Sequence, residues 1–275
     1  MANELGFNEE FNRLKLRYEF LRENYATLVE LYEEKVHILG PDIANQYMAV
    51  IGAREYRIFE LEVSLRRWRR RFALLQMALN RAAKPDFMEI EATLDRELKE
   101  YDALVRSHYE QVHAATDFLK LPKLSEKETT DLRVAYLNAA KKLHPDLNPD
   151  QTDSAKELWL KIQAAYQSAN WEEFRFLVGL VEAVTKEELT FPAADTTNAI
   201  AEMEERCGAL KRKCVELRAA INALDETEPF TYRAVLDDPG KLAEMSAEYD
   251  RRIAALEERE CEYKKRWEEE VSDGK

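Results

Sequence analysis

One short run in this sequence carries side chains that could do chemistry, His144-Pro145-Asp146. It sets an imidazole two residues from a carboxylate, and the proline between them restricts the backbone. A histidine can act as a general base near neutral pH, but the sequence implies no serine or cysteine nucleophile beside it. The seven glycines are isolated, so no Gly-rich phosphate loop is present. We therefore expect a chain that is not an enzyme and needs no cofactor.

The remaining histidines and the cysteines do not suggest a metal centre. His108 and His113 are five residues apart, off the four-residue step that places two ligands on one helix face. The cysteines are odd in number, which does not suit a disulfide framework. Cys207 and Cys214 are seven residues apart, which is not a common metal-ligand spacing. We expect no metal site, and free thiols in a reducing compartment.

A basic run between residues 66 and 71 contains five arginines around Trp68 and is followed by Phe72. A nucleic-acid site would use the arginines on phosphates and the aromatic side chain for stacking. Alternatively, Trp68 and Phe72 belong to the seam of a helix, and the arginines pair with Glu60, Glu62 or acids of a neighbouring helix. The net charge of −13 disfavours nucleic-acid binding, so we prefer the second interpretation.

The composition predicts an all-α protein. Glycine and proline are few, and charged residues make up 35% of the chain, as in long helices with solvated faces. Apolar residues recur with a heptad step, most regularly at Ile200, Met203, Cys207, Leu210, Cys214, Leu217, Ile221 and Leu224. No apolar run is long enough to span a bilayer, and the acidic N-terminus lacks a signal region. We expect a cytoplasmic protein without a membrane segment.

Helix-breaking signals divide the chain into three predicted regions. Region 1–118 is expected to hold three coiled-coil helices, with breaks at Leu39-Gly40-Pro41-Asp42 and Ala83-Lys84-Pro85-Asp86. Region 119–190 holds a helical hairpin. In region 191–275, a linker at 191–198 precedes an antiparallel coiled-coil hairpin of helices 198–226 and 241–271. A heptad stripe can pack against a helix of the same chain or of a second copy. The sequence is therefore compatible with a homo-oligomer as well as with a monomer.

The central hairpin begins at a capping box, in which Ser125 caps the helix and Glu128 stands three residues later. The helix must end at His144, because Pro145 disfavours helical geometry in the residue before it. A second helix follows, capped by Asp150 or Asp153. The two helices are expected to pack antiparallel and to display the His-Pro-Asp turn at an exposed bend.

The residues of this hairpin resemble a known family. The run from Ala135 to Pro149, AYLNAAKKLHPDLNP, resembles helix II and the loop of J-domains, the module of DnaJ-type co-chaperones. The run from Lys161 to Tyr166, KIQAAY, resembles the helix III that follows. The resemblance implies docking on a DnaK-type ATPase chaperone and stimulation of its ATP hydrolysis. The implied contacts are the loop residues and positive charges on the exposed side of helix II, namely His144, Pro145, Asp146, Arg133, Lys141 and Lys142.

The sequence also departs from the family pattern. Pro122 leaves room for only a stub of helix I, and Leu137 and Leu147 stand where basic residues are common. The two leucines reduce the basic surface that the resemblance implies. We expect the missing part of the core to come from the preceding coiled coil or from a later apolar set, Trp171, Phe174, Phe176, Leu177, Leu180 and Val181.

Two functions are compatible with these features. In the first, the chain is a J-domain-like co-chaperone whose coiled coils bind a client protein or set an oligomer. In the second, it is a coiled-coil scaffold in which the J-like hairpin does not stimulate an ATPase.

Overall fold

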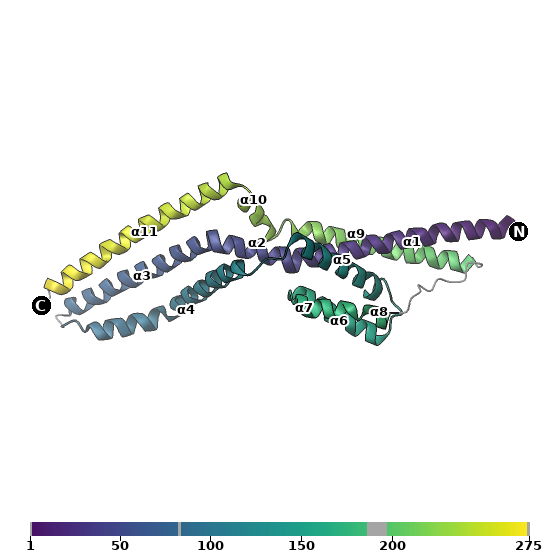
Figure 1. Cartoon of the computed structure of the whole chain (residues 1–275). Coiled ribbons are helices and arrows are strands. Elements are labelled where there is room, and N and C mark those ends of the chain that lie inside the picture. Colours follow the sequence, from purple (N-terminus) through teal and green to yellow (C-terminus); the bar gives the residue numbers. More distant parts are fainter. Residues whose placement is uncertain (1, 82–83, 186–196, 274–275) are drawn as a thin grey trace. The chain divides into compact units, whose positions relative to one another are not determined.

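The structure is a computed structural model that describes residues 2–81, 84–185 and 197–273. Within these ranges it contains helices and turns but no strand, which confirms the all-α fold class (Figure 1). The N-terminal elements are α1 (Ala2–Glu34), η1 (Lys35–Leu39), α2 (Gly40–Tyr47), η2 (Met48–Gly52), α3 (Ala53–Asn80) and α4 (Phe87–Lys120). The middle and C-terminal elements are α5 (Glu126–Leu143), α6 (Asp153–Gln167), α7 (Trp171–Gly179), α8 (Val181–Val184), α9 (Thr197–Leu224), η3 (Phe230–Tyr232), α10 (Arg233–Leu236) and α11 (Pro239–Asp273).

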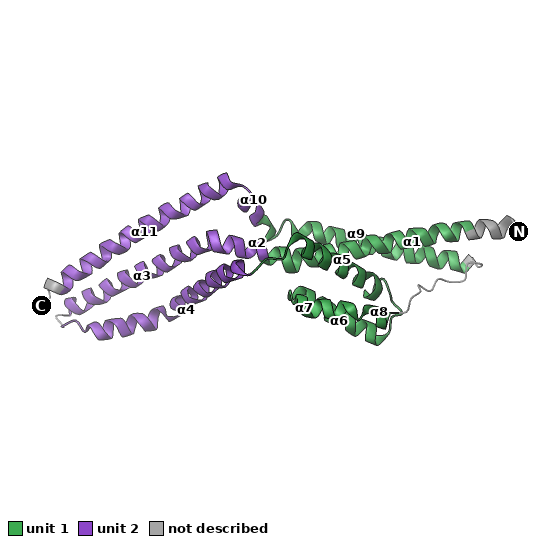
Figure 2. Cartoon of the chain, viewed as in Figure 1, with its two compact units in different colours: residues 1–41, 122–231 green, residues 42–121, 232–275 purple. Residues whose placement is uncertain are grey.

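The chain forms two compact units, each built from separate stretches of sequence (Figure 2). Unit 1 comprises residues 1–41 and 122–231, and unit 2 comprises residues 42–121 and 232–275. The predicted division at residues 118 and 190 differs from this arrangement. The first and last predicted regions are each split between the units, because their helices pair with partners distant in sequence.

In unit 1, α1 and α9 lie side by side and run in the same direction (Figure 1). The Cys207 thiol donates to the Leu14 carbonyl at 3.6 Å, and the Cys214 thiol donates to the Leu21 carbonyl at 3.8 Å. These contacts are one heptad apart on both helices, so the two apolar stripes match in register. Both cysteines are free and buried.

In unit 2, α3 packs against α11 and α4. Arg54 pairs with Asp250 at 2.8 Å, and the rings of Phe72 and Trp267 lie 5.5 Å apart, so α11 runs parallel to α3. The predicted antiparallel hairpin of helices 198–226 and 241–271 is therefore wrong, since α9 belongs to unit 1 and α11 to unit 2. A short connection favours a hairpin, but the seams of α1 and α3 provide the actual partners.

The arginine cluster of α3 faces acidic residues of α4. Arg71 pairs with Glu91 at 2.6 Å, and Arg70 pairs with Glu97 at 2.7 Å. The Trp68 ring lies 6.3 Å from the Trp267 ring. The interpretation of these residues as seam aromatics and flanking charges is confirmed.

Helical conformation continues through Gly40 and Pro41, where the sequence predicted a break. Gly40 has φ −58° and ψ −54°, and its N–H donates to the Lys35 carbonyl five residues earlier. This π turn is wider than an α turn. Pro41 is the second residue of α2. Proline is tolerated in the first turn of a helix, because it has no backbone N–H that would need an acceptor there. The chain therefore stays helical at Gly40 and Pro41, because the helix changes from α to π before these residues.

The predicted linker at 191–198 lies outside the described residues except for its last two, which begin α9. Among the helices that the structure describes, none combines the length and the apolarity needed to cross a bilayer.

Helices α5, α6 and α7 enclose an aromatic core in unit 1. The Tyr136 ring lies 4.3 Å from Tyr166 and 5.5 Å from Trp159, and Tyr136 and Phe174 are fully buried. The apolar set predicted to complete this core is divided. Three members are buried and one is partly buried, namely Phe174, Leu177, Val181 and Trp171. Two face solvent, Phe176 at 68% and Leu180 at 39% exposure.

Replacement of Leu210 by Asp should unfold the α1–α9 pair, because Leu210 is buried in the seam. An unpaired charge there should cost about 3–5 kcal/mol of unfolding free energy. Val215→Asp is the matched control on the exposed side of α9 and should cost less than about 1 kcal/mol. Urea unfolding followed by circular dichroism measures both, and equal midpoints would contradict the seam.

Candidate functional site

Local sequence signals fix both ends of α5. The Ser125 hydroxyl accepts the Glu128 N–H at 3.2 Å, and the Glu128 carboxylate accepts the Ser125 N–H at 2.9 Å. At the other end, His144 leaves the helical region with ψ 129°, as expected of a residue before proline. The predicted capping box and the predicted end at His144 are confirmed. At the start of α6 the cap is Thr152, whose hydroxyl accepts the Ala155 N–H, not Asp150 or Asp153 as predicted.

Helices α5 and α6 run antiparallel on either side of the turn. Near the turn, the His144 ring lies 5.4 Å from Trp159, and farther away the Tyr136 ring lies 4.3 Å from Tyr166. Residue numbers therefore fall along α5 as they rise along α6. The turn is the corner at which the two helices meet.

The turn is held by its own hydrogen bonds. The backbone N–H of Asp146 donates to the His144 Nδ1 at 3.1 Å, and the N–H of Asn148 donates to the His144 carbonyl at 2.9 Å. The Asn148 amide donates to the Lys141 carbonyl at 3.0 Å, which satisfies a free carbonyl of the last turn of α5. Leu147 is 1% exposed and anchors the turn in the core. The backbone of the corner is therefore preorganised.

Both carboxylate oxygens of Asp146 are already occupied within the chain. Oδ1 accepts from the Lys213 ammonium of α9 at 2.6 Å, and Oδ2 accepts from the Tyr25 hydroxyl of α1 at 2.5 Å. Burial alone would raise the pKa of Asp146, but these two donors outweigh it and lower the pKa below its usual value. Burial and the Asp146 contact raise the pKa of the Tyr25 hydroxyl. Asp146 is thus an ionised carboxylate that joins the turn to two helices.

The His144 ring lies between two aromatic side chains. Its centroid is 5.3 Å from Tyr25 and 5.4 Å from Trp159, both in edge-to-face geometry. Burial lowers the pKa of His144, and Lys213 acts in the same direction against the attraction of Asp146. A neutral ring agrees with Nδ1 acting as an acceptor, which leaves the proton on Nε2.

Arg22 of α1 ties the end of α5 to the α1–α9 pair. Its guanidinium donates to the Lys141 carbonyl at 2.8 Å and to the Asn148 side-chain oxygen at 3.0 Å. A cation beside the last carbonyls of a helix also complements the helix dipole. Burial lowers the pKa of Arg22, which is the expected effect of desolvating a cation.

The turn is less exposed than the sequence predicted. Pro145 faces solvent, but His144 and Asp146 are half-buried. The predicted exposed bend therefore presents the proline, while α1 and α9 shield much of the imidazole and the carboxylate. The reason is the long-range packing of α1, which the local sequence of the hairpin does not encode.

The predicted basic residues of α5 are paired with acidic residues. Arg133 bonds the buried Glu34 of α1, and Lys141 pairs with Glu23 of α1 at 2.9 Å. Lys142 bonds a third acid, from α8, in the pair Lys142–Glu182. Their side chains keep 44%, 32% and 41% of their surface exposed. Arg133 and Lys141 therefore pair toward α1, and all three cations are matched by carboxylates instead of lying free on one exposed side of α5.

The imidazole of His144 is engaged within the turn itself. The acceptor Nδ1 of His144 is occupied by a backbone N–H rather than facing a nucleophile. In the part of the chain that the structure describes, no group of His, Cys, Asp and Glu side chains could hold a metal ion. The corner presents an exposed proline beside a neutral imidazole and a paired carboxylate.

Comparison with known proteins gives no relative, since no family model, curated protein or solved structure matches this chain.

Sequence reasoning missed the three residues that hold the turn, Arg22, Tyr25 and Lys213. Lys213 precedes Cys214, which belongs to the predicted apolar stripe of α9. This position indicated that Lys213 flanks the seam. Nothing local connects it to a carboxylate 67 residues earlier.

Replacement of Asp146 by Asn should lower the unfolding free energy by about 1 kcal/mol at neutral pH, because the Lys213 pair loses its charge. The folded pKa of Asp146 is depressed, so its stabilisation is complete above the unfolded pKa of about 3.9. It is lost as pH falls through the folded pKa. The difference between wild type and variant should therefore shrink below about pH 4.

Urea unfolding at several pH values measures this difference. Asp131→Asn, on an exposed position of α5, is the matched control and should change stability little at any pH. A pH-independent loss in Asp146→Asn would show that charge pairing is not the cause.

Proposed function

We propose that this chain is a J-domain-like co-chaperone whose α5–α6 corner engages a DnaK-type ATPase chaperone. One observation carries the proposal: Pro145 projects into solvent from a preorganised corner between antiparallel helices, beside an ionised Asp146. A stiff corner loses little entropy on docking. The coiled-coil helices that frame it are proposed to recruit a client protein.

Docking requires an exchange of partners at Asp146. An arginine of the chaperone would bind the carboxylate in a bidentate fashion, in place of the Lys213 ammonium. The side chains of Lys213 and Asp146 are 42% and 33% exposed, so the pair is accessible. A pair this exposed contributes only about 0–1 kcal/mol, which an arginine contact can exceed.

A second candidate function is an interaction scaffold without ATPase-stimulating activity. The observation that favours it is the internal pairing of the basic residues, in which Arg133 and Lys141 bond acidic residues of α1. A surface neutralised in this way attracts an acidic partner less strongly. In this role Asp146 serves only to fasten the hairpin to α1 and α9.

His144→Gln separates the two functions. With a DnaK-type chaperone, wild-type protein should stimulate steady-state ATP hydrolysis, and the variant should abolish the stimulation. His113→Gln, on an exposed position of α4, should stimulate as the wild type does. Equal rates with wild type, variant and no added protein would favour the scaffold.

Lys213→Met tests the exchange of partners directly. Removal of the ammonium frees Oδ1 of Asp146, so stimulation should rise if an arginine of the chaperone competes for that oxygen. The ATPase rate is measured against chain concentration, and circular dichroism checks that helix content is unchanged. A fall in stimulation with intact helicity would instead mean that Lys213 itself contacts the chaperone.

A further inference from the structure

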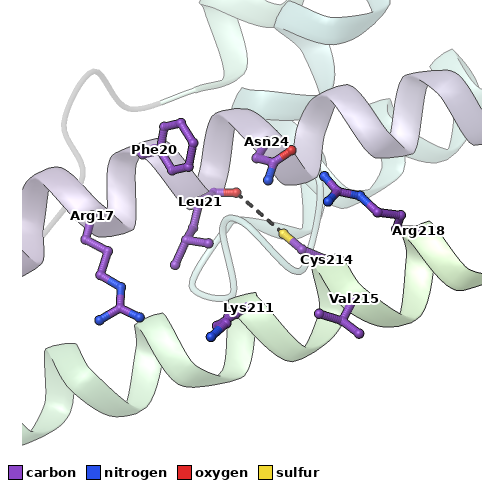
Figure 3. Close-up of a pocket in the computed structure, with 8 residues that line it drawn as sticks. All are labelled: Arg17, Phe20, Leu21, Asn24, Lys211, Cys214, Val215 and Arg218. Atoms are coloured by element: carbon purple, nitrogen blue, oxygen red, sulfur yellow. Dashed lines mark hydrogen bonds between the residues drawn. The ribbon is translucent and has the colours of Figure 1, made fainter.

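A groove runs between α1 and α9, with a volume of about 400 Å³. Figure 3 shows side chains from both helices around it. The lining residues are Arg17, Phe20, Leu21, Asn24, Lys211, Cys214, Val215 and Arg218. The hydrogen bond from Cys214 to Leu21 lies among these residues, so the groove follows the apolar seam of the helix pair.

The charged residues of this groove all have the same sign. Arg17 precedes Leu21 by one helical turn, and Lys211 and Arg218 stand one turn before and after Cys214. Among the described residues, none of the three cations makes an ion pair. Flanking positions of paired helices normally carry opposite charges, whereas like charges repel. Within residues 2–81, 84–185 and 197–273, this flank therefore lacks carboxylates that pair with its cations.

Two apolar side chains of the groove are also uncovered. Phe20 is 68% exposed and Val215 is 61% exposed. They stand on opposite walls of the groove, Phe20 on α1 and Val215 on α9 (Figure 3). An apolar pair bordered by cations matches a helix that carries an apolar stripe between acidic residues.

The opposite flank of the same helix pair shows how such cations are satisfied. There Arg22 of α1 and Lys213 of α9 are covered by the turn after α5. The carboxylate of Asp146 neutralises Lys213, and the Lys141 carbonyl and the Asn148 side-chain oxygen accept from Arg22. One flank is thus closed by the turn after α5, which brings a carboxylate, while no segment in the described part of the chain supplies a carboxylate to the cations of the other flank.

We infer that the open flank binds an acidic amphipathic helix of another protein. Its apolar stripe would cover Phe20 and Val215, and its carboxylates would pair with Arg17, Lys211 and Arg218. A symmetric dimer through this groove would place these cations against the same cations of a second copy, which disfavours self-association. The surface lies on α1 and α9, so this inference does not depend on the function proposed for the α5–α6 corner.

The probe is a synthetic helix with leucine at the seam positions and glutamate at the flanking positions, labelled for fluorescence anisotropy. A control peptide has lysine in place of each glutamate. The full-length chain should bind the acidic peptide and not the basic one, with affinity that falls as salt rises. Arg17→Glu combined with Lys211→Glu should weaken binding by about tenfold or more.

Arg212→Glu is the matched charge reversal, because Arg212 is exposed on α9 but does not line the groove. It should leave binding unchanged. In the free chain, Arg17→Glu should raise the melting temperature by about 1–2 °C, since it removes repulsion from Lys211. A merely structural role of Arg17 would lower the melting temperature, and that result would overturn the inference.

Four other outcomes would also overturn it. The acidic peptide fails to bind, or it binds wild type and the double variant equally. Light scattering shows an oligomer that the double variant dissociates, which assigns the groove to a second copy. A single-stranded DNA probe binds more tightly than the acidic peptide, which assigns the groove to nucleic acid.

Discussion

Helices α1 and α9 run in the same direction although 193 residues separate their paired positions. Two helices joined by a short connection pack antiparallel. Parallel packing requires a long crossover that returns the chain to the end of the pair at which the first helix began. Everything from η1 to α8 lies within that crossover. The positions of the hairpin, the turn and the groove in unit 1 are all defined with respect to this one helix pair.

The charges that flank the seam explain why the hairpin docks where it does. Arg22 and Lys213 would repel across the seam, and the turn after α5 brings the carboxylate and carbonyls that satisfy them. Asp146 therefore links three elements through one side chain, and Tyr25 serves both the seam and the turn. The residues with the chemistry of a binding site are also part of the framework.

Local signals in the sequence predicted local structure well. Proline before a helix end, a capping box and a regular apolar stripe each act over a few residues, so the boundaries of α5 and the seam of α9 were predicted correctly. The choice of partner was not predictable in the same way. A heptad stripe requires a partner but does not specify which, and the seams of α1, α3, α9 and α11 are chemically similar.

The candidate site shows the same division. The corner at His144 follows from Pro145, while its environment depends on Tyr25 and Lys213, which are distant in sequence. Likewise, the break predicted at Gly40 and Pro41 was wrong because a π turn accommodates both residues. Sequence rules for helix ends assume that an α-helix must stop, and do not include a change of helix type.

The crossover between α1 and α9 also has a consequence for biosynthesis. Ribosomes add about 5–20 residues per second, so the two halves of the seam emerge roughly 10–40 s apart. During that interval α1 has left the ribosome, while the partner that buries Leu14, Tyr18 and Leu21 has not yet been made. The nascent chain must therefore carry an uncovered apolar stripe on α1 until α9 has been translated.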